Sequence, residues 1–497
     1  MAFQGNRLFL GNFHGFNVFD VADPLHVKLL VSVVCPPGQS DLAVYGNLLF
    51  MSSEPPTGRL DCGAGGSMEG VDKARFRGVR IFDISNLTQP RQVAAVQTCK
   101  GSHTLTLLPD RRNPRILYVY NDTTRLVRSS EELAGCVADP DDPNTALFSI
   151  DVIKVPIDAP EKAEIVNRPR LFKDPATGKL NSLAAGGERP GQITSSATRN
   201  CHDITVYPDI GLAAAACYGN GLLLDISDPA DPKRLDAVTD PNMGYWHSGT
   251  FNNKGDVVVF GDEWGAGQEP HCRPSDPQLW GGDTTLTVAN GKLVHQGYYK
   301  IPNNQGPTEN CMAHNGNLIP IPGRDVIVQA WFQGGASVFD FTDPIHPFEI
   351  AYFDRGPLSD SELLIGGYWS AYWYNGLIYA SEIARGLDIL RLEPSDLLSK
   401  NEIAAGTLIQ DAELNPQTQR RIVWPDKPVV AEAYLDQLAR DKALPTARIA
   451  AARRALAAQG SKPAIALAAQ LDKLAALAQG RTADRLAGVA RVLRAKP

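Results

Sequence analysis

Four histidines of this chain have the side-chain chemistry and the sequence context of metal ligands. His103, His202, His247 and His314 each stand at the start of a short apolar stretch, in SHTLTLLPD, CHDITVYPD, WHSGTFNN and AHNGNLIP. Neutral imidazoles without a thiolate suit iron, copper or zinc better than calcium or magnesium. The four residues are far apart in the sequence, so only the fold can bring them together.

An internal repeat predicts such a fold. One phrase, a β-rich stretch that ends in Asp and is followed by a Pro-containing turn, occurs seven times when diverged copies are included. The clearest copies are NVFDVADP from Asn17, VRIFDISN from Val79, LLLDISDPADP from Leu222 and SVFDFTDP from Ser337. A second phrase, two strands joined by a Gly, Asn or Asp turn, precedes each copy. Together they predict an all-β fold, a seven-bladed β-propeller; a β-sandwich is the alternative, and seven matched units argue against it.

The four histidines occupy one equivalent position of this repeat, just before the innermost strand of four consecutive units. Ser40 holds that position in the second unit and Trp369 in the seventh. In a propeller this position lies at the mouth of the central channel, where the side chains converge. With 9 histidines among 497 residues, such agreement by chance is improbable. The alternative is a packing role copied by duplication, which would give a polar channel without a metal.

The turns FDVADP, FDISN, LDISDPADP and FDFTDP resemble the repeat of the LVIVD family of bacterial β-propellers, over about residues 2–395. This resemblance implies the fold and says little about activity, because propellers host many functions. In architecture, though not in sequence motif, the histidines are similar to those of carotenoid-cleaving oxygenases, which hold iron with four histidines backed by glutamates. They are also similar to those of selenium-binding protein and methanethiol oxidase propellers, which use channel histidines for copper. These likenesses imply redox chemistry.

Acidic residues at the ends of neighbouring strands are expected on the same face. Metal-bound imidazoles usually donate their second N–H to a carboxylate or a carbonyl, which fixes the ring. The candidates for this role are Glu54, Asp262, Glu263, Glu309 and Glu382. Each of them, taken alone, could equally be a solvated loop carboxylate.

The eight cysteines include no CxxC motif, and their positions in the repeat suggest disulfides on the histidine face. The expected pairs are Cys62–Cys99, Cys136–Cys201 and Cys272–Cys311, while Cys35 and Cys217 either pair or stay free. An even number of cysteines and long loops favour a secreted or periplasmic protein. The alternative is a set of reduced thiols in a cytosolic protein. Met1 runs straight into strand-like sequence, so a signal peptide is expected to have been removed or to lie upstream.

The composition changes near the C-terminus. Residues 1–395 are predicted to form the propeller, 396–425 a linker and 426–497 a small α-helical module, whose Ala- and Leu-rich sequence has helical spacing. The first unit begins at Ala2 and the last ends near Leu392 without a fourth strand. The strand that closes the ring is expected upstream of Met1 or after residue 395. The helices are interpreted as packing surface, with a protein partner or self-association as the alternative.

Charge and composition exclude several function classes. The net charge of −7 and the scattered basic residues argue against nucleic-acid binding, and no apolar run reaches the roughly 20 residues of a membrane span. We therefore expect a metal-dependent enzyme, an oxidase or oxygenase that uses copper or iron on a small-molecule substrate. Zinc, with a hydrolase or lyase reaction, is a further possibility. The competing hypothesis is a non-catalytic extracellular scaffold that recognises protein or carbohydrate through the propeller rim.

Overall fold

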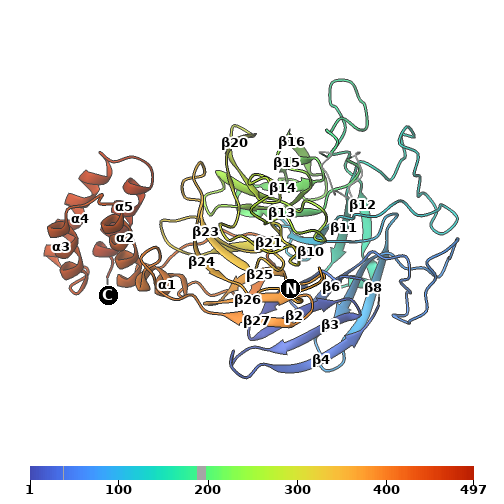
Figure 1. Cartoon of the computed structure of the whole chain (residues 1–497), viewed down its shortest axis with the longest axis horizontal. Helices are drawn as coiled ribbons and strands as arrows, with labels where there is room; N and C mark the ends of the chain where they lie inside the picture. The colour runs from blue at the N-terminus through green and yellow to red at the C-terminus, as the bar shows by residue number, and fades with distance from the viewer. Residues whose placement is uncertain (37, 187–197, 497) are drawn as a thin grey trace.

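The computed structural model describes residues 1–36, 38–186 and 198–496. The fold is mostly β, built from antiparallel sheets of short strands, and a few helices follow at the C-terminus (Figure 1). No helix in the described ranges has both the length and the apolar character needed to cross a membrane.

Strands that follow one another in the sequence lie side by side in each sheet. The first sheet contains β1 (Ala2–Gln4), β2 (Arg7–Asn12), β3 (Gly15–Asp20) and β4 (Lys28–Val34), with the late strand β28 (Glu413–Leu414) beside β1. The second contains β5 (Leu42–Tyr45), β6 (Leu48–Ser53), β7 (Gly78–Asp83) and β8 (Arg91–Gln97). The third contains β9 (Leu105–Pro109), β10 (Ile116–Asn121), β11 (Asp151–Pro156) and β12 (Glu164–Asn167).

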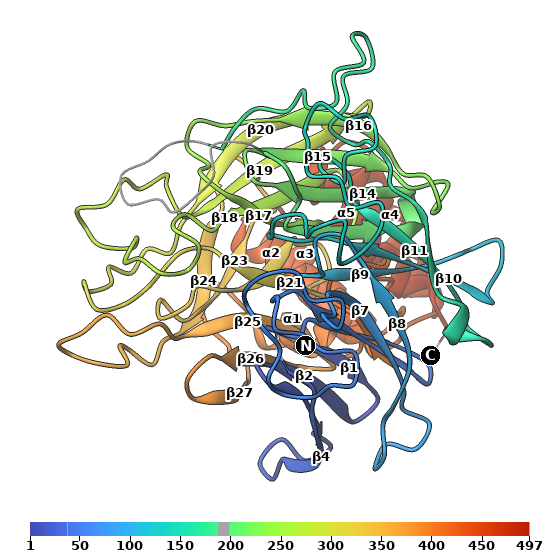
Figure 2. The same ribbon diagram turned by 90° about the vertical axis from the view of Figure 1, so that its right-hand side faces the viewer.

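The later sheets repeat this pattern around the molecule (Figure 2). The fourth contains β13 (Asp203–Tyr207), β14 (Leu212–Cys217), β15 (Asn220–Asp225) and β16 (Lys233–Val238). The fifth contains β17 (Trp246–Phe251), β18 (Val257–Asp262), β19 (Asp283–Ala289) and β20 (Lys292–Tyr299). A larger sheet joins β21 (Asn315–Ile319), β22 (Val326–Ala330), β23 (Ala336–Asp340) and β24 (Phe348–Phe353) to β25 (Tyr368–Tyr374), β26 (Leu377–Glu382) and β27 (Gly386–Leu390), through parallel pairing of β21 with β25.

The aspartate of the repeated phrase has a clear physical role. It ends the third strand of its sheet, and its carboxylate accepts a hydrogen bond from the backbone N–H two residues later, which closes the turn. These bonds are Ala22 N to Asp20, Ser85 N to Asp83, Ser227 N to Asp225 and Thr342 N to Asp340, at 2.7 to 3.0 Å. The turn sets the direction of the outer strand, so the repeat specifies the hairpin.

Residues 411–424, here called the strap, cross from one sheet to the next along their first strands. Backbone or side-chain hydrogen bonds join the strap to Gly5 after β1, Val44 in β5, Leu107 in β9, Val206 in β13, Phe251 in β17, Pro320 after β21 and Asn375 after β25. Residues after 395 therefore contact both the first sheet, through β28 beside β1, and the last hairpin, through Asn375. They do not supply the fourth strand that was one expectation, since no described strand after 395 pairs with β27.

In the part of the chain that the structure describes, the C-terminal helices are α1 (Lys400–Gly406), α2 (Pro428–Arg440), α3 (Thr446–Leu456), α4 (Lys462–Ala475) and α5 (Gly480–Arg494). Helices α2 to α5 share an apolar core to which Ala405 of α1 also belongs, and Figure 1 shows them beside the sheets, next to α1. Glu402 of α1 forms a buried ion pair with Arg324 of the β21–β22 turn at 3.0 Å. Gln437 of α2 donates a hydrogen bond to the Pro322 carbonyl at 2.7 Å. The helices are thereby anchored on this turn.

The eight cysteines form four disulfides: Cys35–Cys62, Cys99–Cys136, Cys201–Cys217 and Cys272–Cys311. The last is as expected, whereas the expected pairs Cys62–Cys99 and Cys136–Cys201 are wrong. The long loops that carry Cys62 and Cys136 lie against the segment that leaves the preceding sheet, where Cys35 and Cys99 stand. Cys201 bonds within its own sheet, because β13 and β14 are neighbours.

Candidate metal centre

The four histidines meet in one row, although they come from four different sheets. Ring centroids lie 4.4 Å apart for His103 and His202, 3.9 Å for His202 and His247, and 4.1 Å for His247 and His314. Three of these residues are fixed through the backbone in the same way, since each N–H donates to a carbonyl within one residue of the end of the second strand of its sheet. These bonds join His103 to Asp122, His202 to Ala216 and His314 to Ala330, at 2.7 to 3.0 Å.

One nitrogen of three of the rings is held by an oxygen atom. His103 Nδ1 donates to Glu54 Oε2 at 2.9 Å, His202 Nδ1 lies 3.3 Å from Asp203 Oδ1, and His314 Nδ1 donates to the carbonyl of Trp369. Such bonds orient the rings and leave each Nε2 available. This is the arrangement found around metal-binding histidines.

Among the four histidines, His247 is the one whose ring makes no hydrogen bond to a described residue. Its side chain is fully buried, and neither ring nitrogen has a hydrogen-bond partner among the described residues. Its Nε2 lies 3.6 Å from Glu263 Oε2, and His314 Nε2 lies 3.7 Å from Glu263 Oε1. Two groups with metal-ligand geometry share it: His202, Asp203 and His247, and His247, Glu263 and His314, with ligand atoms within 4.8 Å of one another in each group. Buried polar atoms are normally satisfied, so this imidazole requires an explanation.

Electrostatics keeps most of these rings neutral. Burial lowers the pKa of His314 to about 3, and burial with the neighbouring histidines lowers the pKa of His247 well below its usual value. His103 differs, because the charge of Glu54 outweighs burial and raises the pKa of His103 to about 9. Burial alone would raise the pKa of Glu54, but His103 and the Thr124 N–H lower it to about 2. Burial raises the pKa of Glu263 to about 8.

Two of the five acids expected beside the histidines are there, Glu54 and Glu263. Asp262 instead accepts hydrogen bonds from the Gly244, Tyr245 and Gly281 N–H groups and so holds a turn. Glu309 accepts from the Gly306 N–H at 2.6 Å, and Glu382 accepts from Gly367 and Ala384, at 2.7 and 2.8 Å. These three acids therefore bond to loop backbone and not to a histidine, so the expectation that they orient the imidazoles is wrong. Glu382 also lines the adjoining cavity.

Asp203 is a site residue that the sequence reasoning missed. It follows His202 directly and is 1% exposed, and its second oxygen accepts a hydrogen bond from Asn315 Nδ2 at 2.6 Å. Burial would raise its pKa, but His202 and Asn315 lower it, so the carboxyl group is ionised. Its place next to a repeated histidine was the available signal.

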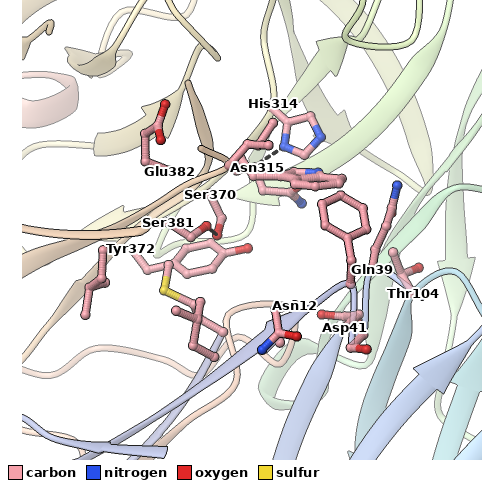
Figure 3. A pocket seen from close by; sticks show the side chains of 18 of the residues that line it. Asn12, Gln39, Asp41, Thr104, His314, Asn315, Ser370, Tyr372, Ser381 and Glu382 are labelled. Carbon is pink, nitrogen blue, oxygen red and sulfur yellow. Dashed lines mark hydrogen bonds between the residues drawn. The ribbon is translucent and has the colours of Figure 1, made fainter. Parts of the chain in front are cut away.

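A cavity of about 320 Å³ opens beside the histidines. His103, His202 and His314 line it, together with residues from the first and last sheets. Figure 3 shows polar side chains around this space from several segments, among them Asn12, Asp41, Asn315 and Tyr372. A small molecule in this cavity would lie directly against the imidazole row.

No family model and no curated protein matches this chain. Solved structures with a similar backbone include a periplasmic gluconolactonase from Pseudomonas aeruginosa, with 15% identity, a TM-score of 0.47, and 78% of this chain and 99% of that chain covered. Hydrazine synthase from Kuenenia stuttgartiensis has 12% identity and a TM-score of 0.47, covering 78% and 93%. A hypothetical selenium-binding protein from Sulfolobus tokodaii has 10% identity and a TM-score of 0.45, covering 76% and 83%.

Proposed function

We propose that this protein is a metal-dependent enzyme in which His103, His202, His247 and His314 hold one iron or copper ion. We further propose that it oxidises a small molecule bound in the adjoining cavity, with molecular oxygen as the oxidant. The observation that carries the proposal is His247, a fully buried imidazole without a hydrogen-bond partner among the described residues, between two other histidines.

Two groups of these residues have ligand atoms within 4.8 Å of one another, His202–Asp203–His247 and His247–Glu263–His314, and this spacing supports an ion beside His247. Three rings are oriented through Nδ1, two of them by acids. Glu263 stands within 4 Å of the Nε2 atoms of His247 and His314. Catalytic zinc sites usually have three protein ligands, and structural zinc is closed at four. Four histidines with a cavity on one side need at least five coordination positions. That number suits iron or copper.

The surrounding residues would orient the ligands and exclude bulk water from the site. Glu54 holds the His103 ring in place, and the packed sheets keep bulk water from His247. When bound, a redox-active ion would transfer electrons between the substrate and oxygen. The four disulfides support an oxidising location outside the cytosol, secreted or periplasmic. We also propose that the sheets form seven blades, with β21–β24 and β25–β27 as two of them.

Metal analysis of protein purified without added metal tests the proposal. We expect about one iron or copper ion per chain, lost in His202→Ala and His247→Gln, because each removes a ligand. The matched control is His346→Ala, since His346 lies exposed in a turn beside Asp343. Circular dichroism checks that each variant is folded, and oxygen consumption reports turnover.

A different result would favour the binding-scaffold hypothesis. Protein that is metal-free as purified, and that gains no stability from added iron or copper, contradicts the metal site. Metal retained by both ligand variants contradicts it as well. Stoichiometric zinc would keep the site and exclude the oxidative reaction.

A further inference from the structure

One end of the cavity is polar, and the repeat builds it. Five residues that line the cavity each follow directly the repeat position that a histidine, Ser40 or Trp369 holds: Asp41, Thr104, Asp203, Asn315 and Ser370. Figure 3 shows Asp41, Thr104 and Asn315 around the same space. Their carboxylate, hydroxyl and amide groups both accept and donate hydrogen bonds. This end, beside the histidine row, therefore suits a polar head group.

The other end of the cavity is apolar and lies between the first sheet and the last hairpin. Leu10 of β2 and Phe19 of β3 form one wall, and Ile383 after β26 and Leu387 of β27 form the other. Phe19 and Leu387 belong to one apolar cluster that joins these two parts of the structure. Both β3 and β27 are two strands away from the first strand of their sheet. Because neighbouring strands are roughly 5 Å apart, the apolar end lies about 10 Å from the strands that carry the polar residues.

Polar side chains near the apolar end are largely engaged by the protein. Ser381 Oγ lies 2.8 Å from Ser370 Oγ, and Glu382 accepts hydrogen bonds from two backbone N–H groups at 2.7 and 2.8 Å. The Oδ1 atom of Asn17 in β3 is buried within the wall and not at its surface. A ligand would therefore meet mainly alkyl and ring carbons here. An elongated molecule with one polar and one apolar end matches the two ends of the cavity.

We propose that the cavity binds a primary aliphatic alcohol, with its hydroxyl beside the histidine row and its tail between the first sheet and the last hairpin. This inference rests on the proposed function and names the substrate class of the same site. A hydroxyl suits the polar end because it both donates and accepts hydrogen bonds, and the tail buries methylene groups against Phe19 and Leu387. In the oxidation, one C–H and one O–H bond of the alcohol break and a carbonyl double bond forms. Molecular oxygen takes up the two electrons and two protons and becomes hydrogen peroxide.

Straight-chain alcohols of increasing length test the tail. Butanol, hexanol and octanol, each with a terminal hydroxyl, are titrated into the protein as purified and followed by isothermal titration calorimetry. Each methylene buried in the apolar end should strengthen binding by about fourfold, which is ~0.8 kcal/mol. Equal affinities of the three alcohols overturn the proposal, and so does the absence of octanol binding.

Two variants locate the tail. Leu387→Asn places an amide against the hydrocarbon and should reduce the gain in affinity per methylene. Leu235→Asn is the matched control, because Leu235 is 39% exposed on β16 and does not line the cavity, and it should keep the full gain. Circular dichroism checks that both variants are folded. The same gain in both variants contradicts the proposed place of the tail.

Photolabelling of the unaltered protein gives the orientation without any substitution. An octanol that carries a diazirine at the end of its tail should label the segments of β2–β3 or β26–β27, as peptide mass spectrometry reads out. Labelling confined to the segments that carry the histidines overturns the orientation. Metal content of the same samples separates the two proposals. Metal-free protein with the chain-length gain fails only the proposed function, and metal-loaded protein without the gain fails only this inference.

Discussion

A single carboxylate shows how the histidine row is held. Glu54 Oε2 accepts the His103 Nδ1 proton, and Oε1 accepts hydrogen bonds from Thr123 Oγ1, Thr124 N and Thr124 Oγ1 at 2.6 to 3.0 Å. The residue follows β6 and the threonines follow β10, so Glu54 ties two neighbouring sheets to one imidazole. A carboxylate with this many donors is both ionised and immobile.

Replacement of Glu54 should therefore weaken metal binding without removing a ligand. We expect Glu54→Gln to lower the affinity for the ion by about 10- to 100-fold, the usual cost of losing a partner that orients a metal-bound histidine. Competition with a chelator of known affinity measures the change. Glu309→Gln is the matched control, because that side chain bonds to the Gly306 N–H and not to a histidine. Equal affinities of the two variants would contradict the role of Glu54.

At this scale the sequence predicted which residue types meet, and less well which way they point. The histidines could be found because the repeat places them at one position. Asp262 and Glu263 are adjacent at a strand end, and neighbouring side chains of a strand lie on opposite faces. Glu263 therefore faces the histidines, while Asp262 faces the turn amides. Direction at strand ends depends on bends that the repeat does not encode.

At the scale of elements, the strap supplies hydrogen-bond partners to the edges of the first strands of the sheets. The first strand of a sheet has an edge with unpaired backbone groups, and such edges need partners. Asn415 exchanges two hydrogen bonds with the Val44 backbone, both at 2.8 Å. Gln419 does the same with Phe251, at 2.8 and 2.9 Å. These side-chain amides imitate the backbone of an additional strand.

Truncation of these amides should destabilise the protein. Asn415→Ala and Gln419→Ala each leave a backbone N–H and carbonyl without partners, which costs about 1–3 kcal/mol. Denaturant unfolding followed by fluorescence measures the loss. Gln410→Ala serves as the control, because its exposed side chain bonds only to the nearby Thr407 carbonyl. A loss in the control as large as in the strap variants would mean that the strap adds nothing specific.

The strands and the strap differ in how far the sequence reveals them. Alternating apolar residues and repeated Asp turns identify the strands, because burial and turn geometry act locally. The strap has no apolar periodicity, although Leu414 and Trp424 pack against apolar cores. Side-chain amides that meet distant strand edges hold it in place. Only the assembled sheets define those edges. Residues 396–425 could therefore be predicted as a linker, but neither α1 within it nor the hydrogen bonds of the strap to each sheet could be predicted.

Across the whole molecule, the disulfides join segments that the repeat alone does not place together. Cys35–Cys62 and Cys99–Cys136 connect the exit of one sheet to a long loop of the next, whereas Cys272–Cys311 connects a loop to the exit of its own sheet. The pairs expected from the sequence all joined a long loop to the exit of its own sheet, as Cys272–Cys311 does. Which exit a loop reaches depends on the direction in which the loop extends. That direction is set by packing between sheets.

Removal of two of these disulfides should lower stability by similar amounts but affect metal binding differently. Cys201 precedes His202 directly in the sequence, while Cys35 and Cys62 adjoin none of the four histidines of the row. Each disulfide closes a short loop, with sequence separations of 16 for Cys201–Cys217 and 27 for Cys35–Cys62. Loss of either should cost about 3–4 kcal/mol by the loop-entropy argument. We expect Cys201→Ser/Cys217→Ser to weaken metal binding strongly and Cys35→Ser/Cys62→Ser to leave it nearly unchanged.

Denaturant unfolding and chelator competition on the two double-serine variants measure these quantities, and peptide mapping without reductant verifies the remaining links. The reason for the contrast is positional. The Cys201–Cys217 bond fixes the end of β14, whose Ala216 carbonyl accepts the His202 N–H at 2.7 Å. Loosening it moves a proposed ligand, whereas loosening Cys35–Cys62 moves the segment before Ser40. Equal losses of metal affinity at similar stability would show that the histidine row depends on global stability and not on this local support.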